Sequence, residues 1–261
     1  MKITLIGSAG AFDFGETSSS FLLETSTRNV LIDCGHNVLK KLKEKGFMTL
    51  DKYIDTVFIT HLHMDHIADL EGLIYYNYFI LRKRSKIYIP NTLHSDFLKI
   101  FPEEKYSYEY QNKNEKIDCM YELLNTREIN NKNDPIYLRP FEANHPGIKA
   151  YGYEIIKQAV QQDSDVCDRS LITAAIISGD SKANPKLLNI TKEAINKHNY
   201  NSKPLYIFHD YSNWDDITRN VHCCSTDFNL FYKELLNGKN KDKIKFIHYH
   251  NGENVDLEIE I

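Results

Sequence analysis

Four side chains that can bind a metal ion lie within six residues of the sequence. They are His61, His63, Asp65 and His66. In an extended segment His61 and His63 point the same way, because side chains alternate with a period of two, and Asp65 and His66 then begin the next element and project at another angle. This spacing suits two adjacent metal positions. Imidazole combined with carboxylate favours Zn²⁺, Mn²⁺, Fe or Co over Ca²⁺.

The elements around this cluster are a buried strand before it and a helix after it. Residues 53–60 are rich in Ile, Val and Phe and predict the strand, and residues 66–81 have helical length and period. Residues 103–134 are charged and rich in Asn, and predict a surface excursion. The other expected strands cover residues 2–7, 21–24, 29–33, 86–89, 136–143, 150–157, 171–178, 205–208, 244–248 and 255–261, and the other expected helices cover residues 38–45, 185–197 and 226–236. Runs of strands with helices between some of them predict one α/β domain over residues 1–261 with two sheets.

Composition narrows the class of protein. The chain has 32 Lys and Arg against 36 Asp and Glu, a net charge of −4, so it carries no global basic field that would capture nucleic acid. The five cysteines include no CxxC pair, which favours a reducing cytoplasm over a secreted disulfide framework. Because a bilayer span needs about 20 apolar residues and no stretch approaches that length, we expect no membrane association.

The His61 to His66 segment has the pattern HxHxDH, which resembles the signature of the metallo-β-lactamase fold. Later segments resemble that family in the same order: His145 follows a strand, Asp180 lies in a Ser-Gly-Asp-Ser turn, and His248 and His250 end a late strand. The resemblance extends over nearly the whole chain. It implies a four-layer αββα sandwich.

The resemblance also implies a ligand set for two divalent transition-metal ions, with zinc as the first choice, Mn, Fe or Co as alternatives, and no organic cofactor. One ion would be held by His61, His63 and His145, the other by Asp65, His66 and His248, with Asp180 bridging both. His250 is the alternative to His248, which we prefer because it directly follows the apolar run 244–247. Asp33 resembles the buried carboxylate that the family places behind the metal histidines.

Two further segments resemble the tRNase Z-like phosphodiesterases within this fold. They are His209-Asp210-Tyr211-Ser212 and His222-Cys223-Cys224-Ser225. The resemblance implies that His222, oriented by Asp210, acts as general acid or oxyanion stabiliser. It also implies that a metal-bound hydroxide attacks the phosphodiester, with Asp65 orienting or deprotonating the attacking water.

The expected size of the substrate follows from two RNA-binding features that the sequence does not show. tRNase Z enzymes carry an RNA-gripping arm between the third His and the bridging Asp, but here His145 and Asp180 are 35 positions apart and mostly strand. The loop after Gly7 carries Asp13, Phe14, Gly15 and Glu16 rather than a basic residue. An arm-less core resembles the cyclic-nucleotide phosphodiesterases, including phage enzymes that destroy cyclic pyrimidine nucleotide signals.

Our first hypothesis is therefore hydrolysis of 3′,5′-cyclic mononucleotides, a small nucleotide partner that needs no extended basic surface. Aromatic residues from 106–110, Tyr211 or Trp214 would stack on the base. The runner-up is tRNA 3′ processing, with RNA as partner, and a lactone or thioester hydrolase, which has no need of His222, is a third hypothesis. A non-catalytic member is disfavoured because the ligand set is complete.

A homodimer is the expected assembly. The family resemblance is its main support, and the aromatic residues of the 66–81 helix add to it. Those aromatics are Tyr75, Tyr76, Tyr78 and Phe79.

Overall fold

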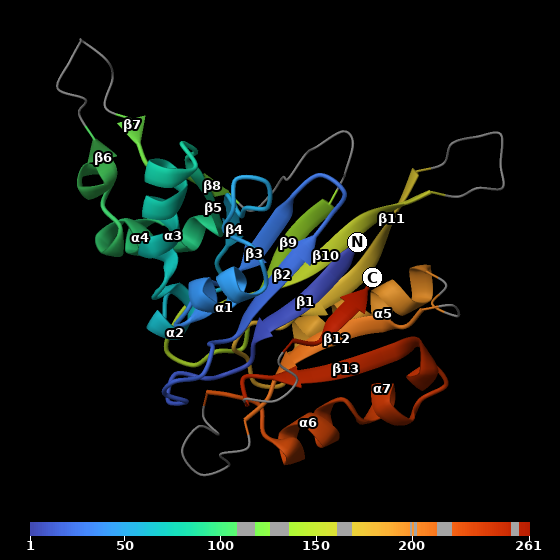
Figure 1. Ribbon diagram of the computed structural model, residues 1–261. Helices are drawn as coiled ribbons and strands as arrows, with labels where there is room; N and C mark the ends of the chain where they lie inside the picture. The colour runs from blue at the N-terminus through green and yellow to red at the C-terminus, as the bar shows by residue number, and fades with distance from the viewer. Residues whose placement is uncertain are drawn as a thin grey trace. The chain divides into compact units, whose positions relative to one another are not determined.

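The computed structural model describes residues 1–108, 118–125, 136–160, 169–198, 200, 203–212, 221–251 and 256–261. Two compact units divide the chain: Met1–Thr126 with Val255–Glu260, and Arg127–Asn254 with Ile261. Each unit is built on one large sheet (Figure 1). The expected single domain over residues 1–261 stays a prediction.

The first unit contains a seven-stranded sheet among its described residues, in the order β14-β1-β2-β3-β4-β5-β8. Its strands are β1 (Lys2–Gly7), β2 (Ser20–Glu24), β3 (Asn29–Ile32), β4 (Thr56–Phe58), β5 (Ser85–Ile89), β8 (Tyr121–Asn125) and β14 (Glu258–Glu260). The pairs from β14 to β3 are antiparallel and those from β3 to β8 are parallel. Strands β1, β3 and β4 therefore run in the same direction, and the loops that follow them emerge at one edge of the sheet.

The helices of the first unit are α1 (Val38–Glu44), α2 (Met64–Ile67), α3 (Leu70–Tyr75), a π-helical turn η1 (Tyr76–Ile80) and α4 (His94–Ile100). Helix α1 was expected, α4 was not, and the predicted helix 66–81 is broken into shorter pieces. Two hydrogen bonds from a neighbouring loop explain the break between α2 and α3. The Asp69 N–H donates to the Cys34 carbonyl at 3.0 Å, outside the helix, and the Cys34 N–H donates to the His66 carbonyl at 2.8 Å. These two bonds dock the loop after β3 onto the helix end.

Part of the predicted surface excursion 103–134 is regular structure. Strand β8 adds to the sheet beside β5, and β6 (Ser107–Tyr108) pairs with β7 (Asp118–Cys119). Tyr121 anchors β8 because it is 1% exposed and its hydroxyl donates to the Phe101 carbonyl. Residues 109–117 and 126–134 of the excursion lie outside the described part of the chain.

The second unit contains a five-stranded sheet in the order β13-β12-β11-β10-β9, counted over its described residues. Its strands are β9 (Ile136–Glu142), β10 (Tyr151–Val160), β11 (Arg169–Ile177), β12 (Leu205–Asp210) and β13 (Ile244–Tyr249). Strands β11, β12 and β13 are parallel, so their carboxyl ends share one edge of the sheet. All five strands were expected from the sequence, with ends within a few residues.

Three helices of the second unit pack around an apolar cluster. They are α5 (Pro185–Lys197), α6 (Ser225–Phe231) and α7 (Lys233–Asn237). Helix α5 starts where expected because the Asn184 side chain accepts a hydrogen bond from the Lys186 N–H at 2.9 Å and Pro185 fills the first turn. It buries Leu187, Ala194 and Ile195 in the cluster. No helix of the described residues is long and apolar enough to cross a membrane.

Candidate metal and phosphodiester site

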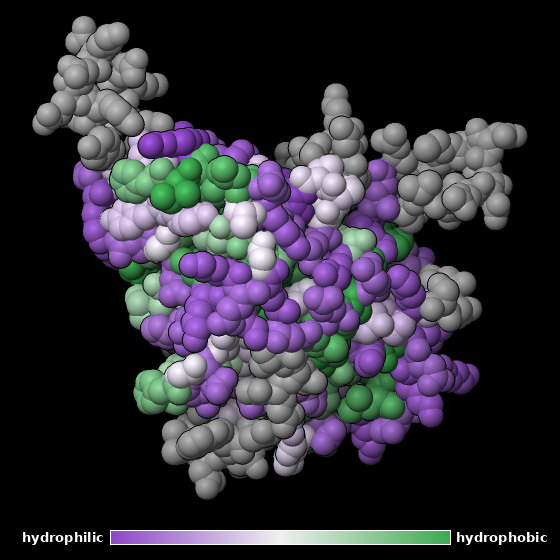
Figure 2. Space-filling view, in the orientation of Figure 1, coloured by the Kyte–Doolittle hydropathy of each residue, from purple (hydrophilic) through white to green (hydrophobic). Residues whose placement is uncertain are grey.

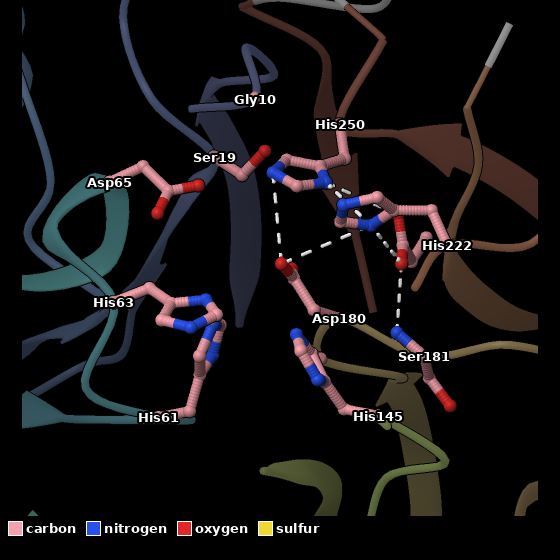
Figure 3. A network of polar contacts seen from close by, with 12 residues as sticks. Gly10, Ser19, His61, His63, Asp65, His145, Asp180, Ser181, His222 and His250 are labelled. Atoms are coloured by element: carbon pink, nitrogen blue, oxygen red, sulfur yellow. Dashed lines mark hydrogen bonds and ion pairs between the residues drawn. The ribbon is translucent and has the colours of Figure 1, made fainter. Parts of the chain in front are cut away.

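The HxHxDH loop of the first unit leaves the sheet after β4 with its donor atoms close together (Figure 3). His61 Nε2 and His63 Nδ1 are 3.1 Å apart, and His66 Nε2 and the Asp65 carboxylate are 3.5 Å apart. His61, Asp65 and His66 are buried, whereas His63 is exposed. The loop thus presents two pairs of donors, as its spacing predicts.

These separations fit ligands of a divalent ion. A tetrahedral zinc ion with nitrogen ligands at about 2.0–2.1 Å places neighbouring ligands about 3.4 Å apart. Both donor pairs of the loop lie close to that value. The donor set of imidazole and carboxylate is also the one expected for zinc or its neighbours.

Hydrogen bonds behind the ligands orient two of the imidazoles. His66 Nδ1 lies 2.7 Å from the Asp33 carboxylate, and His61 Nδ1 lies 3.1 Å from the Thr60 hydroxyl. Each contact occupies Nδ1 and so fixes the orientation of the ring. Asp33 therefore supports a histidine of the HxHxDH loop, and its place behind a metal ligand stays a prediction.

Asp33 itself is held in an unusual conformation. Its φ is 62°, in the left-handed region, and its carboxylate accepts hydrogen bonds from the Thr60 N–H at 2.8 Å and the Thr60 hydroxyl at 2.7 Å. Burial raises the pKa of Asp33, although His66 and the hydrogen bonds from Thr60 act in the opposite direction. Sequence analysis missed Thr60, whose position directly before His61 was the available signal.

The second unit gathers a cluster of carboxylates and imidazoles at the carboxyl ends of its parallel strands. Donor atoms of Asp180, Asp210, His222 and His250 lie within 4.8 Å of one another. Asp180 follows β11, Asp210 ends β12, and His250 follows β13, so the shared strand direction brings them to one edge. Figure 3 shows His222 and His250 pointing toward Asp180.

Asp210 holds both histidines of this cluster. One carboxylate oxygen lies 2.8 Å from His222 Nδ1 and accepts the Ser181 N–H at 2.8 Å, and the other lies 3.3 Å from His250 Nδ1. His250 Nε2 then faces Asp180 at 3.8 Å. The pairing of His222 with Asp210 is the arrangement that sequence analysis expected. The contribution of the Ser181 N–H was missed, because a backbone donor has no sequence signal of its own.

The Asp210–His222 contact shifts the pKa of both groups. Burial alone disfavours the charged form of each, but their mutual attraction and hydrogen bond outweigh it. The pKa of His222 is therefore raised and that of Asp210 is lowered. A raised pKa favours the protonated imidazole, which is the form that a general acid requires.

His145 lies in the loop after β9, close to the turn that carries Asp180. Its Nδ1 contacts the Pro146 carbonyl oxygen at 3.0 Å, which fixes the orientation of the ring. The neighbouring Asn144 accepts from the Lys182 N–H at 3.1 Å, and its own N–H donates to the Ser181 hydroxyl at 2.9 Å. These bonds tie the His145 loop to the Asp180 turn within the second unit.

The preference for His248 as last ligand is not supported, because the structure brings His250 to the cluster instead. Strand β13 continues past the apolar run to Tyr249, and His248 stacks on Tyr211 with ring centroids 4.1 Å apart and planes 8° apart. His250 lies just beyond the strand with φ 70°, and this left-handed turn directs its ring to Asp180 and Asp210. The correction follows from where the strand ends.

Comparison with known proteins identifies a protein family whose model matches this chain. The family model of the anti-Pycsar protein Apyc1 matches residues 1–258. An anti-Pycsar protein Apyc1 from Bacillus phage 010DV004 is 43% identical over 95 residues, which is 36% of this chain and 36% of the phage protein. That match therefore spans about a third of the length of the curated relative.

Two solved structures show the fold. The metallo-β-lactamase fold protein YhfI from Bacillus subtilis matches with a TM-score of 0.62 at 19% identity, over 96% of this chain and 86% of YhfI. The short form of human tRNase Z matches with a TM-score of 0.62 at 17% identity, over 100% of this chain and 99% of that one. The expected metallo-β-lactamase fold is confirmed, and the donor set is that of a metal-dependent hydrolase. Because the family model covers nearly its whole length, this chain belongs to the anti-Pycsar protein Apyc1 family.

Proposed function

We propose that this protein is a binuclear metal-dependent phosphodiesterase that hydrolyses 3′,5′-cyclic mononucleotides. The observation that carries the proposal is the pair of buried Asp210 and half-buried His222 beside Asp180. A positioned imidazole with a raised pKa suits an anionic substrate whose leaving oxygen must be protonated. Membership of a family whose members are named anti-Pycsar proteins supports a cyclic-nucleotide substrate.

The metal ligands in this proposal follow the set that the family resemblance implies, with His250 in place of His248. His61, His63 and His145 would hold one divalent ion, Asp65, His66 and His250 the other, and Asp180 would bridge them. Zinc is the first choice, with Mn, Fe or Co as alternatives. When bound, two such ions activate a water molecule at neutral pH and neutralise phosphoryl charge.

The chain's own residues supply proton transfer. His222 Nε2 carries the proton that passes to the departing 3′ oxygen, while Asp210 holds Nδ1 and stabilises the charged ring. Asp65, 5% exposed, orients the attacking water. A lactone or thioester hydrolase would need the ligands but not the Asp210–His222 pair.

The substrate class is tested by hydrolysis of a panel of cyclic mononucleotides, methyl p-nitrophenyl phosphate and a 3′-extended tRNA. We expect cyclic mononucleotides to be cleaved best. His222→Ala should lower kcat about 10²- to 10⁴-fold with metal content unchanged, as for loss of a general acid. Efficient cleavage of the tRNA with no cleavage of any cyclic mononucleotide would establish tRNA processing instead.

The metal assignment is tested by elemental analysis of two matched variants. We expect about two ions per chain in the wild type, loss of metal in His250→Ala, and near wild-type metal content in His248→Ala. Asp180→Ala should lose both ions, because a bridging carboxylate serves each of them. Metal loss in His248→Ala without metal loss in His250→Ala would show that His248 is the last ligand.

We also propose a homodimer. Figure 2 shows hydrophobic side chains gathered over α3 in the first unit, where Phe79 is 42% and Ile80 is 58% exposed just after the helix. Light scattering at micromolar concentration should give twice the mass of 30.5 kDa. A mass of one chain would contradict this part of the proposal.

A further inference from the structure

Two of the aromatic residues that sequence analysis nominated for base stacking already have partners in the described part of the chain. Tyr106 is 1% exposed and its hydroxyl donates to Glu71. The ring of Tyr211 is stacked on His248. Tyr110 and Trp214 lie outside the described residues. Neither Tyr106 nor Tyr211 is therefore fully open to a nucleobase.

Two phenylalanines of the loop between β1 and β2 are exposed to an unusual degree. Phe12 is 71% exposed and Phe14 is 89% exposed. Exposure of large apolar side chains to water is unfavourable, so such side chains on a loop tip point to a ligand or another surface that covers them. This is the loop in which sequence analysis found acidic residues where an RNA-binding relative would carry a basic one.

Hydrogen bonds within the loop hold both rings outward. The Asp13 N–H donates to the Gly10 carbonyl at 3.3 Å, and the Glu16 N–H donates to the Asp13 carbonyl at 3.2 Å. These bonds close two successive β-turns with Phe12 in the first and Phe14 in the second. The Asp13 carboxylate also accepts the Gly10 N–H at 2.9 Å. A tip fixed in this way pays little conformational entropy when it binds a flat ligand.

The base of this loop lies against the HxHxDH loop of the same unit, which is the proposed metal-binding loop. The Ser18 N–H donates to the His36 carbonyl at 3.0 Å, and the His36 N–H donates to the Ser18 hydroxyl at 3.1 Å. A Cβ atom on Gly35 would lie 1.6 Å from the Asp65 carbonyl oxygen and 2.7 Å from Ser18 Cβ. In space, the backbone at Ser18 and the backbone at Asp65 thus lie on either side of Gly35, where no side chain would fit. Figure 3 labels Gly10 and Ser19 of the loop in the same view as Asp65 and His63.

Charge indicates which end of a nucleotide meets the tip. Asp13 and Glu16 flank Phe14, and their carboxylates repel a phosphate. The neutral, flat nucleobase is the part of the substrate that an aromatic tip with acidic flanks accepts. Stacking tolerates any base, since every base has a π face.

We propose that Phe12 and Phe14 form a base-stacking wall that binds the nucleobase of the cyclic nucleotide while the metal-binding loop engages its phosphate. This inference rests on the proposed function and adds the residues that recognise the base. Because stacking acts on the bound substrate and not on the reacting bonds, the wall lowers KM and leaves kcat nearly unchanged.

The test compares Phe12→Ala, Phe14→Ala, the double variant and Phe14→Trp on cyclic mononucleotides and on methyl p-nitrophenyl phosphate. Leu50→Ala is the matched control, since Leu50 is 73% exposed in the same unit but lies in the segment before β4, away from the metal-binding loop. We expect the double variant to raise KM for cyclic nucleotides roughly 10- to 100-fold, the range for loss of base stacking. Phe14→Trp should keep the wild-type KM. The phosphodiester without a base and the Leu50→Ala variant should be unaffected.

Three results would overturn the inference. The first is a double variant with wild-type KM for cyclic nucleotides that the wild type does cleave. The second is an equal loss on the substrate that has no base, and the third is a change of oligomeric state in the double variant, which would make the two rings a contact between copies. A wild type that cleaves no cyclic nucleotide at all would refute the proposed function, and this inference with it.

Discussion

His209 offers a pH test of how the second unit positions Asp210. Its side chain is fully buried against the rings of Phe228 and Tyr232. His209 Nδ1 contacts the Asp210 carbonyl oxygen at 2.7 Å and Nε2 contacts the Tyr232 hydroxyl at 2.9 Å. A neutral ring that donates from Nδ1 and accepts at Nε2 satisfies both contacts. Burial lowers the pKa of His209 to about 4.

The sign of the effect on stability follows from linkage. An unfolded histidine has a pKa near 6.5, so between pH 6.5 and 4 the unfolded chain binds a proton that the folded chain does not. Stability is therefore lost as pH falls through this window and the loss levels off below it. A shift of about 2.5 units at about 1.4 kcal/mol per unit gives roughly 3 kcal/mol.

The assay is urea unfolding of the metal-free wild type and of His209→Phe at several pH values from 7.5 to 4.5. Carboxylates and the other histidines titrate in both proteins and cancel in the difference. The variant should be less stable at pH 7.5, because Tyr232 and Asp210 lose a partner, and the gap should narrow by about 2.5 kcal/mol by pH 4.5. His209→Gln provides a second comparison, in which the substituted side chain is polar but does not titrate. A gap that stays constant over this range would refute the assignment of a buried neutral imidazole.

Three substitutions test other parts of the site and its supports. Asp33→Asn, which keeps a residue tolerant of positive φ, should weaken metal binding about 10- to 100-fold in chelator competition, because His66 loses its charged partner. Gly179→Ala should cost about 2–5 kcal/mol in urea unfolding, since its φ is 64° and a Cβ atom would lie 2.2 Å from the Tyr151 carbonyl oxygen. Gly147→Ala, also at positive φ but with nothing within 4 Å, is its control and should cost only about 1 kcal/mol. Asn184→Ala should cost about 1 kcal/mol by removing the helix cap, and an unchanged midpoint would contradict the capping role.

Much of the fold could be predicted because its strands are short, apolar and bounded by turns. The HxHxDH segment could be placed between a strand and a helix from period alone, and Asp33 was nominated by its resemblance to a buried carboxylate of the family. The break in helix 66–81 could not be predicted. It depends on hydrogen bonds between Cys34 and both His66 and Asp69, which are remote in sequence.

The preference for His248 over its alternative His250 failed to match the geometry for a different reason. Two histidines with one residue between them point to the same side while the strand continues, so the sequence favours whichever follows the apolar run. The outcome depends on β13 extending to Tyr249 beside β12, and on the left-handed turn at His250. Pairing length and a positive φ at a non-glycine residue are set by tertiary contacts and leave little trace in the sequence.

Strand β14 has a consequence for how the protein is made. It closes the free side of β1, and it is built from residues 258–260, which are synthesised after the whole second unit. A growing chain therefore leaves the ribosome with the outer strand of its first sheet unpaired, and that edge can pair with a neighbouring nascent chain. The sheet of the first unit is therefore complete only once residues 258–260 have been synthesised. A ribosome pause before residue 258 would thus leave the outer edge of β1 unpaired although its own unit is otherwise translated.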